Sequence, residues 1–243
     1  MSLLLAPSPV LYPLGDAAVV ADFGGGISPA TLQRIQALRR HLLQRPCPGL
    51  RELVPGYTTL TAYYDPWPLS QAGLQPPYEQ VTAWLQAQLS AADVAAEAAA
   101  PPETIELPVC YGGEWGPDLA AVAQHTGLTP AEVVARHAAP TYLVHLLGFL
   151  PGFAYLGGLD AALATPRRAV PRALVPAGAV GIAGGQTGVY PLASPGGWQL
   201  IGRTPLQLFN PAWLAPTWLQ AGQQVRFVPI GAAEFHQLRR HEP

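Results

Sequence analysis

Lysine is absent from this chain of 243 residues, and its permanently charged basic side chains are therefore all arginines. Without lysine, no side chain can form a Schiff base, and no P-loop lysine can hold nucleotide phosphates. Charged residues make up only 12% of the sequence and leave a net charge of −2. Such a chain lacks the strong positive charge by which nucleic acid or an anionic membrane surface is bound. We therefore expect neither as a partner.

Cysteines and metal-ligand motifs are also scarce. Cys47 and Cys110 are the only cysteines, they lie too far apart for a metal or redox motif, and no H-E-x-x-H sequence occurs. We therefore expect no metal site. No apolar run is long enough to span a membrane, and the start of the chain lacks the positive segment of a signal peptide. These absences predict a cytoplasmic protein with reduced thiols.

The first part of the chain alternates between strand-like and helix-like segments. These segments are a strand at 17–23, a helix from Ser28, strands at 50–54 and 58–64, a helix from Tyr78, and a strand at 104–110. The β-α-β-β-α-β order predicts a ferredoxin-like unit. The last strand either completes that unit or begins the next domain. We place the boundary at Pro101-Pro102, which gives an N-terminal α/β domain of residues 1–100 and a C-terminal domain of residues 101–243.

The C-terminal domain is dominated by a stretch from Gly148 to Pro205, in which glycine and proline interrupt short apolar runs. Glycine allows positive φ angles and proline fixes φ, so this composition predicts a tightly turned β-barrel or β-sandwich. Two short helices precede it, and Thr129-Pro130-Ala131-Glu132 gives the second a capping box. The expected fold class is therefore α+β.

The same stretch contains arginines and a glycine-rich turn that suit an anionic ligand. Arginine presents a planar, permanently charged fork to a carboxylate or phosphate, and successive backbone N–H groups of a turn add donors. The alternative is that these arginines form surface ion pairs, which contribute little. The candidate substrate-binding residues are Arg168, Arg172, Gly184, Gly185, Gln186, Thr187, Arg203 and Thr204.

Aromatic residues of this stretch form either the wall of an apolar pocket or ordinary barrel core. The candidates for the wall are Phe153, Tyr190 and Trp198. Among the histidines, His125 and His137 are expected at the surface or as helix caps, and His145 in the core. No nucleophile with a neighbouring base stands out, so the sequence names no catalytic residue.

The segments GFLPGFAYLG, PRRAVPR, VPAGAVGIAGGQTGVYP and SPGGWQLIGRTP closely resemble the family called allophanate hydrolase subunit 1. Weaker similarity continues through VPGYTTLTAYYDP, LPVCYGGEWGPDL and VRFVPI, so the resemblance covers most of the chain. The family includes the B subunit of the bacterial ATP-hydrolysing 5-oxoprolinase and the kinase inhibitor KipI. The resemblance implies that the C-terminal domain is a cyclophilin-like β-barrel.

The resemblance also implies a role as one subunit of an ATP-dependent 5-oxoprolinase, which converts 5-oxoproline to glutamate together with subunits A and C. The assembled complex would use ATP with Mg²⁺, and this chain alone would bind neither tightly. The residues agree, because they offer binding groups without a complete catalytic set. Two alternatives stay open: a KipI-like protein that binds and inhibits a sensor histidine kinase, and a component of urea or allophanate metabolism. Fold alone does not decide among them.

Overall fold

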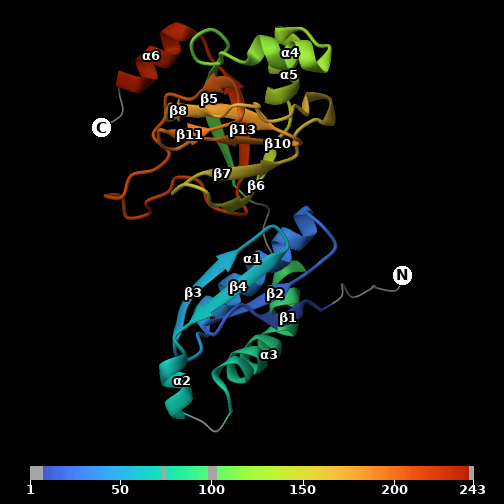
Figure 1. Ribbon diagram of the computed structural model, residues 1–243, viewed down its shortest axis with the longest axis vertical. Helices are drawn as coiled ribbons and strands as arrows, with labels where there is room; N and C mark the ends of the chain where they lie inside the picture. The colour runs from blue at the N-terminus through green and yellow to red at the C-terminus, as the bar shows by residue number, and fades with distance from the viewer. Residues whose placement is uncertain (1–7, 73–74, 98–102, 241–243) are drawn as a thin grey trace. The chain divides into compact units, whose positions relative to one another are not determined.

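A computed structural model of the chain describes residues 8–72, 75–97 and 103–240. The chain divides into two compact units, Met1–Pro101 and Pro102–Pro243. The first contains a four-stranded sheet with helices, and the second contains a closed β-barrel, which confirms the α+β class (Figure 1). In the described part of the chain, no helix is both long enough and apolar enough to cross a membrane.

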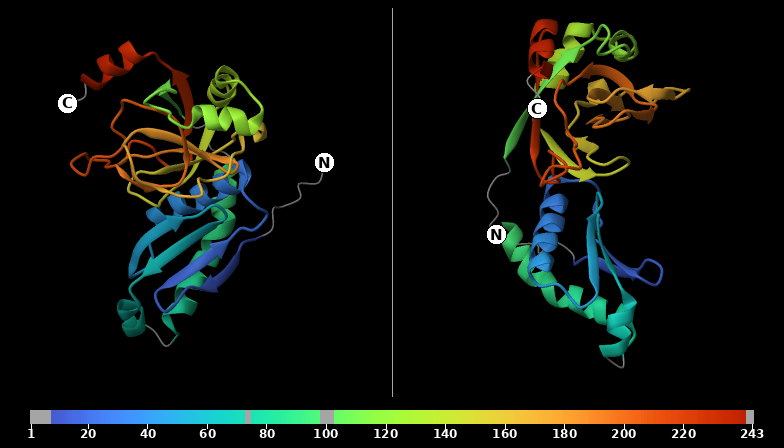
Figure 2. Two further views of the ribbon diagram at one scale, coloured as in Figure 1. Left: turned by 45° about the horizontal axis from the view of Figure 1, so that its top comes forward. Right: turned by 90° about the vertical axis from the view of Figure 1, so that its left-hand side faces the viewer.

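The sheet of the first unit is antiparallel, with the strand order β1-β2-β4-β3. Helices α1 and α3 lie side by side on one face of it (Figure 2). Its core forms between this face and the apolar side of α1, where Ile35 and Leu38 are buried. The elements are β1 (Val10–Pro13), β2 (Ala18–Asp22), α1 (Pro29–Gln44), β3 (Leu50–Pro55), β4 (Thr59–Tyr64), α2 (Pro66–Ala72) and α3 (Pro77–Glu97).

The ferredoxin-like order expected for this unit is not found, because the last strand lies elsewhere. Strand β5 (Thr104–Tyr111) pairs with barrel strands, and its Leu107 and Val109 are fully buried in the barrel core. The edge of the first sheet is instead occupied by β1, which pairs with β2. Strand β1 escaped prediction because an edge strand needs little apolar patterning, and its Val10 is 66% exposed.

The second unit is a closed barrel of seven strands in the order β10-β7-β6-β13-β5-β12-β9. This confirms a β-barrel, while its cyclophilin-like character stays a prediction. Val180, Ile182 and Phe227 are among the side chains that fill its core. The further strands are β6 (Tyr142–Leu147), β7 (Ala154–Gly157), β8 (Arg172–Val175), β9 (Ala179–Ala183), β10 (Gln186–Val189), β11 (Ser194–Gly196), β12 (Gln199–Arg203) and β13 (Gln224–Pro229).

Three α-helices accompany the barrel in the part of the chain that the structure describes: α4 (Leu119–Thr126), α5 (Pro130–Ala138) and α6 (Ala232–Arg240). The predicted capping box of α5 is confirmed, since the Glu132 N–H donates to Thr129 Oγ1 at 3.2 Å and the Thr129 N–H donates back to Glu132 Oε2 at 2.7 Å. The segment before α4 passes very close to β12. A Cβ on Gly116 would lie 2.0 Å from the Ile201 carbonyl oxygen, so only glycine fits there.

Candidate functional site

Two of the predicted arginines, Arg168 and Arg172, converge on the carboxylate of Asp118. Arg172 Nη2 lies 2.7 Å and Arg168 Nη1 lies 3.2 Å from Asp118 Oδ1. Asp118 Oδ2 accepts the Leu200 N–H at 2.7 Å, and the Asp118 side chain is only 6% exposed. This carboxylate therefore joins the start of α4 to β8 and β12, with one charged group at the centre of three elements.

These ion pairs differ from both expectations for the arginines. They are not isolated surface pairs, because the acceptor is buried. They also engage each guanidinium within the chain, because each donates to Asp118, although a guanidinium has further N–H donors. Two positive charges face one negative charge, and Arg172 Nη1 is buried without a hydrogen-bond partner in the described structure. A substrate role for Arg168 and Arg172 stays a prediction.

The glycine-rich turn lies at a different place, between β9 and β10. The Gly184 N–H donates to the Thr165 carbonyl oxygen at 2.7 Å, so this donor is already used. Gly185 follows it in the turn, and Gln186 begins β10. Thr187 is fully buried, and its hydroxyl contacts Gly181 and His137. Neither the Gly184 N–H nor the Thr187 hydroxyl is open to a ligand in this arrangement.

His137 lies inside the barrel, which corrects the expectation that it is a surface or capping residue. The Thr187 hydroxyl donates to the Gly181 carbonyl oxygen at 3.0 Å, so it accepts a hydrogen bond from His137 Nε2 at 2.9 Å. Nδ1 then accepts from the Tyr111 hydroxyl at 2.8 Å, and the ring is neutral. The i,i+4 spacing of Val133 and His137 is the sequence signal for this buried face of α5, but the partners of the ring come from β5 and β10 and could not be predicted. His125 is exposed and His145 is buried, as expected.

Complete burial lowers the pKa of His137 from its ordinary value of 6.5 to about 3. The unfolded chain therefore binds a proton at this residue in a pH range where the folded chain does not. The contribution of the buried, neutral His137 to the free energy of unfolding is complete above pH 6.5 and is lost as the pH falls toward 3. Between these values the free energy of unfolding changes by up to about 1.4 kcal/mol per pH unit. We therefore expect the free energy of unfolding to decrease as the pH is lowered from 6.5 toward 3.

Urea unfolding of the wild type, His137→Gln and His125→Gln between neutral and mildly acidic pH measures this effect. The slope of stability against pH should be smaller in His137→Gln, because this variant lacks the buried titrating group. His125→Gln should keep the wild-type slope, since His125 is exposed. Equal slopes in all three proteins would show that His137 is not kept neutral by burial.

The aromatic candidates are both core residues and residues of a pocket wall. Phe153, Tyr190 and Trp198 are buried and pack edge to face, with Phe153 ring centroids 5.1 Å from Tyr190 and 5.4 Å from Trp198. They also line a pocket of about 300 Å³. At this pocket, Phe149 takes a positive φ of 67° and is 62% exposed. Backbone strain of this kind clusters at functional sites, so Phe149 makes this pocket a candidate binding site.

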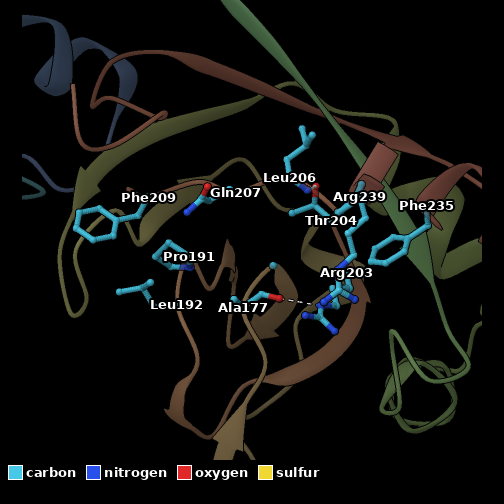
Figure 3. A pocket seen from close by; sticks show the side chains of 12 residues that line it. Ala177, Pro191, Leu192, Arg203, Thr204, Leu206, Gln207, Phe209, Phe235 and Arg239 are labelled. Carbon is cyan, nitrogen blue, oxygen red and sulfur yellow. Dashed lines mark hydrogen bonds between the residues drawn. The ribbon is translucent and has the colours of Figure 1, made fainter. Parts of the chain in front are cut away.

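Arg203 and Thr204 line a second pocket, of about 230 Å³ (Figure 3). Arg203 Nε donates to the Ala177 carbonyl oxygen at 2.7 Å. Arg239 of α6 lines the same pocket, so a second guanidinium stands beside the first. Sequence reasoning missed Arg239, because paired arginines near the end of a helix are indistinguishable from ordinary solvated residues. Within the described residues, no group of three or more histidine, cysteine, aspartate or glutamate side chains is placed to hold a metal ion.

Residues 9–219 match the model of the family described as carboxyltransferase domain, subdomain C and D. The chain belongs to this family. It is 43% identical over 229 residues to the B subunit of 5-oxoprolinase from Bacillus subtilis (strain 168), covering 93% of this chain and 95% of the relative. It is 46% identical over 220 residues to the B subunit of 5-oxoprolinase from Escherichia coli O157:H7, covering 90% of this chain and 94% of the relative. The predicted family membership is thereby confirmed.

Solved structures of similar proteins agree with the fold. The crystal structure of TTHA0988 superposes with a TM-score of 0.73 at 38% identity, covering 88% of this chain and 40% of that one. This chain therefore spans less than half the length of TTHA0988. PH0987 from Pyrococcus horikoshii gives a TM-score of 0.54 at 45% identity, covering 93% of this chain and 100% of that one. Urea amidolyase from Kluyveromyces lactis gives a TM-score of 0.69 at 18% identity, and the match covers 97% of this chain and 16% of that one. At this identity the likeness shows a shared fold alone.

Proposed function

We propose that this chain is the B subunit of an ATP-dependent 5-oxoprolinase and acts in converting 5-oxoproline to glutamate only together with subunits A and C. The observation that carries this proposal is the similarity to proteins named as the B subunit of 5-oxoprolinase. Three such proteins are 41–46% identical to this chain over at least 90% of its length. The KipI-like and urea-related alternatives have weaker support, because none of these three relatives is named for kinase inhibition or urea metabolism and urea amidolyase is only 18% identical.

The residues of the barrel support a subunit that needs chemistry from outside. A hydroxyl–imidazole pair does occur, between Thr187 and His137, but both residues are fully buried. The Thr187 hydroxyl also donates to a backbone carbonyl, so it is not poised to attack a substrate. What the chain offers at its pockets are arginines, which bind and orient anions. The reacting groups are therefore proposed to come from the partner subunits.

The nucleotide is proposed to bind mainly outside this chain. ATP with Mg²⁺ serves the assembled enzyme, and a chain without lysine has no P-loop lysine for its phosphates. Arg203 and Thr204 are the predicted binding residues that line a pocket, and we propose them for the substrate. Arg168 and Arg172 are proposed to add positive charge from their cluster with Asp118. An ATP-dependent metabolic role fits the cytoplasm.

Co-purification tests the partner claim. This chain, co-expressed with an affinity-tagged C subunit, should elute with it in constant ratio, because a stable contact between subunits buries at least about 1,000 Å² in total. An unrelated tagged protein of similar size is the control. Elution of the chain as a free monomer beside the tagged C subunit, with capture by a histidine kinase instead, would favour the KipI-like alternative.

A further inference from the structure

The pocket in Figure 3 contains two arginines without a carboxylate partner in the described structure. The hydrogen bond of Arg203 runs from its Nε to the Ala177 carbonyl oxygen, at 2.7 Å. Arg239 has no ion pair within the described residues. Four arginines of this unit, by contrast, do form ion pairs with carboxylates. They are Arg136 with Asp160, Arg168 and Arg172 with Asp118, and Arg226 with Glu106.

The position of Arg203 is fixed before any ligand binds. Its Nε bond to Ala177 sets the plane of the guanidinium and leaves both terminal nitrogens for a second partner. Burial, and then the charge of Arg239, lower the pKa of Arg203, while Glu114 opposes this effect. The two like charges thus repel in a partly buried place, and an anion between them would remove that repulsion.

Apart from the two arginines, Thr204 and Gln207, the residues that line the pocket are apolar or glycine. In Figure 3 the two guanidinium groups lie together at one end, and Leu192 and Phe209 lie at the other. Pro191 lies on the same side as Leu192. A volume of about 230 Å³ holds a small molecule and not a nucleotide with its triphosphate. The pocket therefore suits an anionic head group joined to a compact body with both apolar and polar surface.

We propose that this pocket binds a small cyclic or branched organic acid, with its carboxylate held between Arg203 and Arg239 and its body against Leu192 and Phe209. Arg239 is thereby a binding residue, supplied by the C-terminal helix α6. The identification of the acid as 5-oxoproline rests on the proposed function. The anion site itself does not rest on it, because it follows from the two arginines and the shape of the pocket.

Calorimetric titration of the full-length chain with three probes tests the proposal. The probes are 5-oxoproline, 2-pyrrolidinone, which is the same ring without the carboxylate, and inorganic phosphate, which is an anion without the apolar body. We expect 5-oxoproline to bind more tightly than the other two. Arg203→Gln and Arg239→Gln should each weaken its binding about 10- to 150-fold, as expected for loss of a hydrogen bond to a charged group. Arg226→Gln, an exposed arginine paired with Glu106, is the matched control and should bind as the wild type does.

Circular dichroism of each variant shows whether the barrel is intact, and a folded Arg239→Gln that binds 5-oxoproline normally would overturn the proposal. Equal affinity for phosphate and 5-oxoproline would overturn the choice of an organic acid. A third outcome is that binding depends on both arginines but an assembled enzyme carrying Arg239→Gln turns over substrate as the wild type does. The anion site would then be real but would have no part in the 5-oxoprolinase reaction. Failure of the complex to assemble leaves this titration unaffected, so the two claims fail separately.

Discussion

Replacing Asp118 by alanine is expected to lower the free energy of unfolding by about 3–5 kcal/mol, because it removes the shared partner of two charged groups. Arg172, which is largely buried, would lose its ion pair, and Arg168 would lose one too. The Leu200 N–H, now paired with Asp118 Oδ2, would become a buried donor without an acceptor.

Urea denaturation of the full chain measures this loss. Asp160→Ala is the matched control, since Asp160 also pairs with an arginine but its side chain is 36% exposed, and its effect should be much smaller. Asp118→Asn should lie between the two, because an amide oxygen still accepts from Leu200 but no longer balances the arginines. Equal losses for Asp118→Ala and Asp160→Ala would refute the structural importance of this cluster.

The same cluster changes how arginine variants should be interpreted. Arg172→Ala would remove one of the two partners of a buried carboxylate, so any loss of enzyme activity would mix binding with stability. Arg203 gives a cleaner test, because it donates to a backbone carbonyl rather than to a buried carboxylate, and the same pocket holds Arg239.

The first unit shows where sequence patterns succeed. Helix α1 could be predicted because Leu32, Ile35, Leu38 and Leu42 repeat at helical spacing, and Ser28 accepts the Thr31 N–H at 3.1 Å as an N-cap. The hairpin of β3 and β4 is likewise indicated by Pro55-Gly56. The pairing of β5 could not be predicted, since its apolar residues would suit either sheet and the partner β13 lies 120 residues away.

The candidate site shows what sequence patterns cannot predict. Composition identified a glycine-rich barrel with arginines, but Asp118 lies 50 residues before Arg168 and 54 before Arg172. No local pattern indicates a contact at that distance in sequence. Arg239 was missed for the same reason, because only the tertiary fold brings α6 to the pocket of Arg203. His137 was misplaced because burial of a neutral histidine depends on partners from β5 and β10.

The largest effect expected is the complete dependence of activity on the partner subunits. The pockets of this chain present binding groups, and its buried Thr187–His137 pair is closed to substrate. Its relatives named as the B subunit of 5-oxoprolinase match it over 95% and 94% of their length. A chain of this kind should not carry out an ATP-driven ring opening by itself.

The most direct measurement is the glutamate formed from 5-oxoproline with ATP and Mg²⁺ by this chain alone, by subunits A and C together, and by all three. We predict glutamate above background only when all three proteins are present, and no ATP consumption stimulated by 5-oxoproline with this chain alone. Glutamate formed by the purified chain unaided, or at an undiminished rate by subunits A and C without it, would contradict the proposal that this chain is a required but not self-sufficient part of the enzyme.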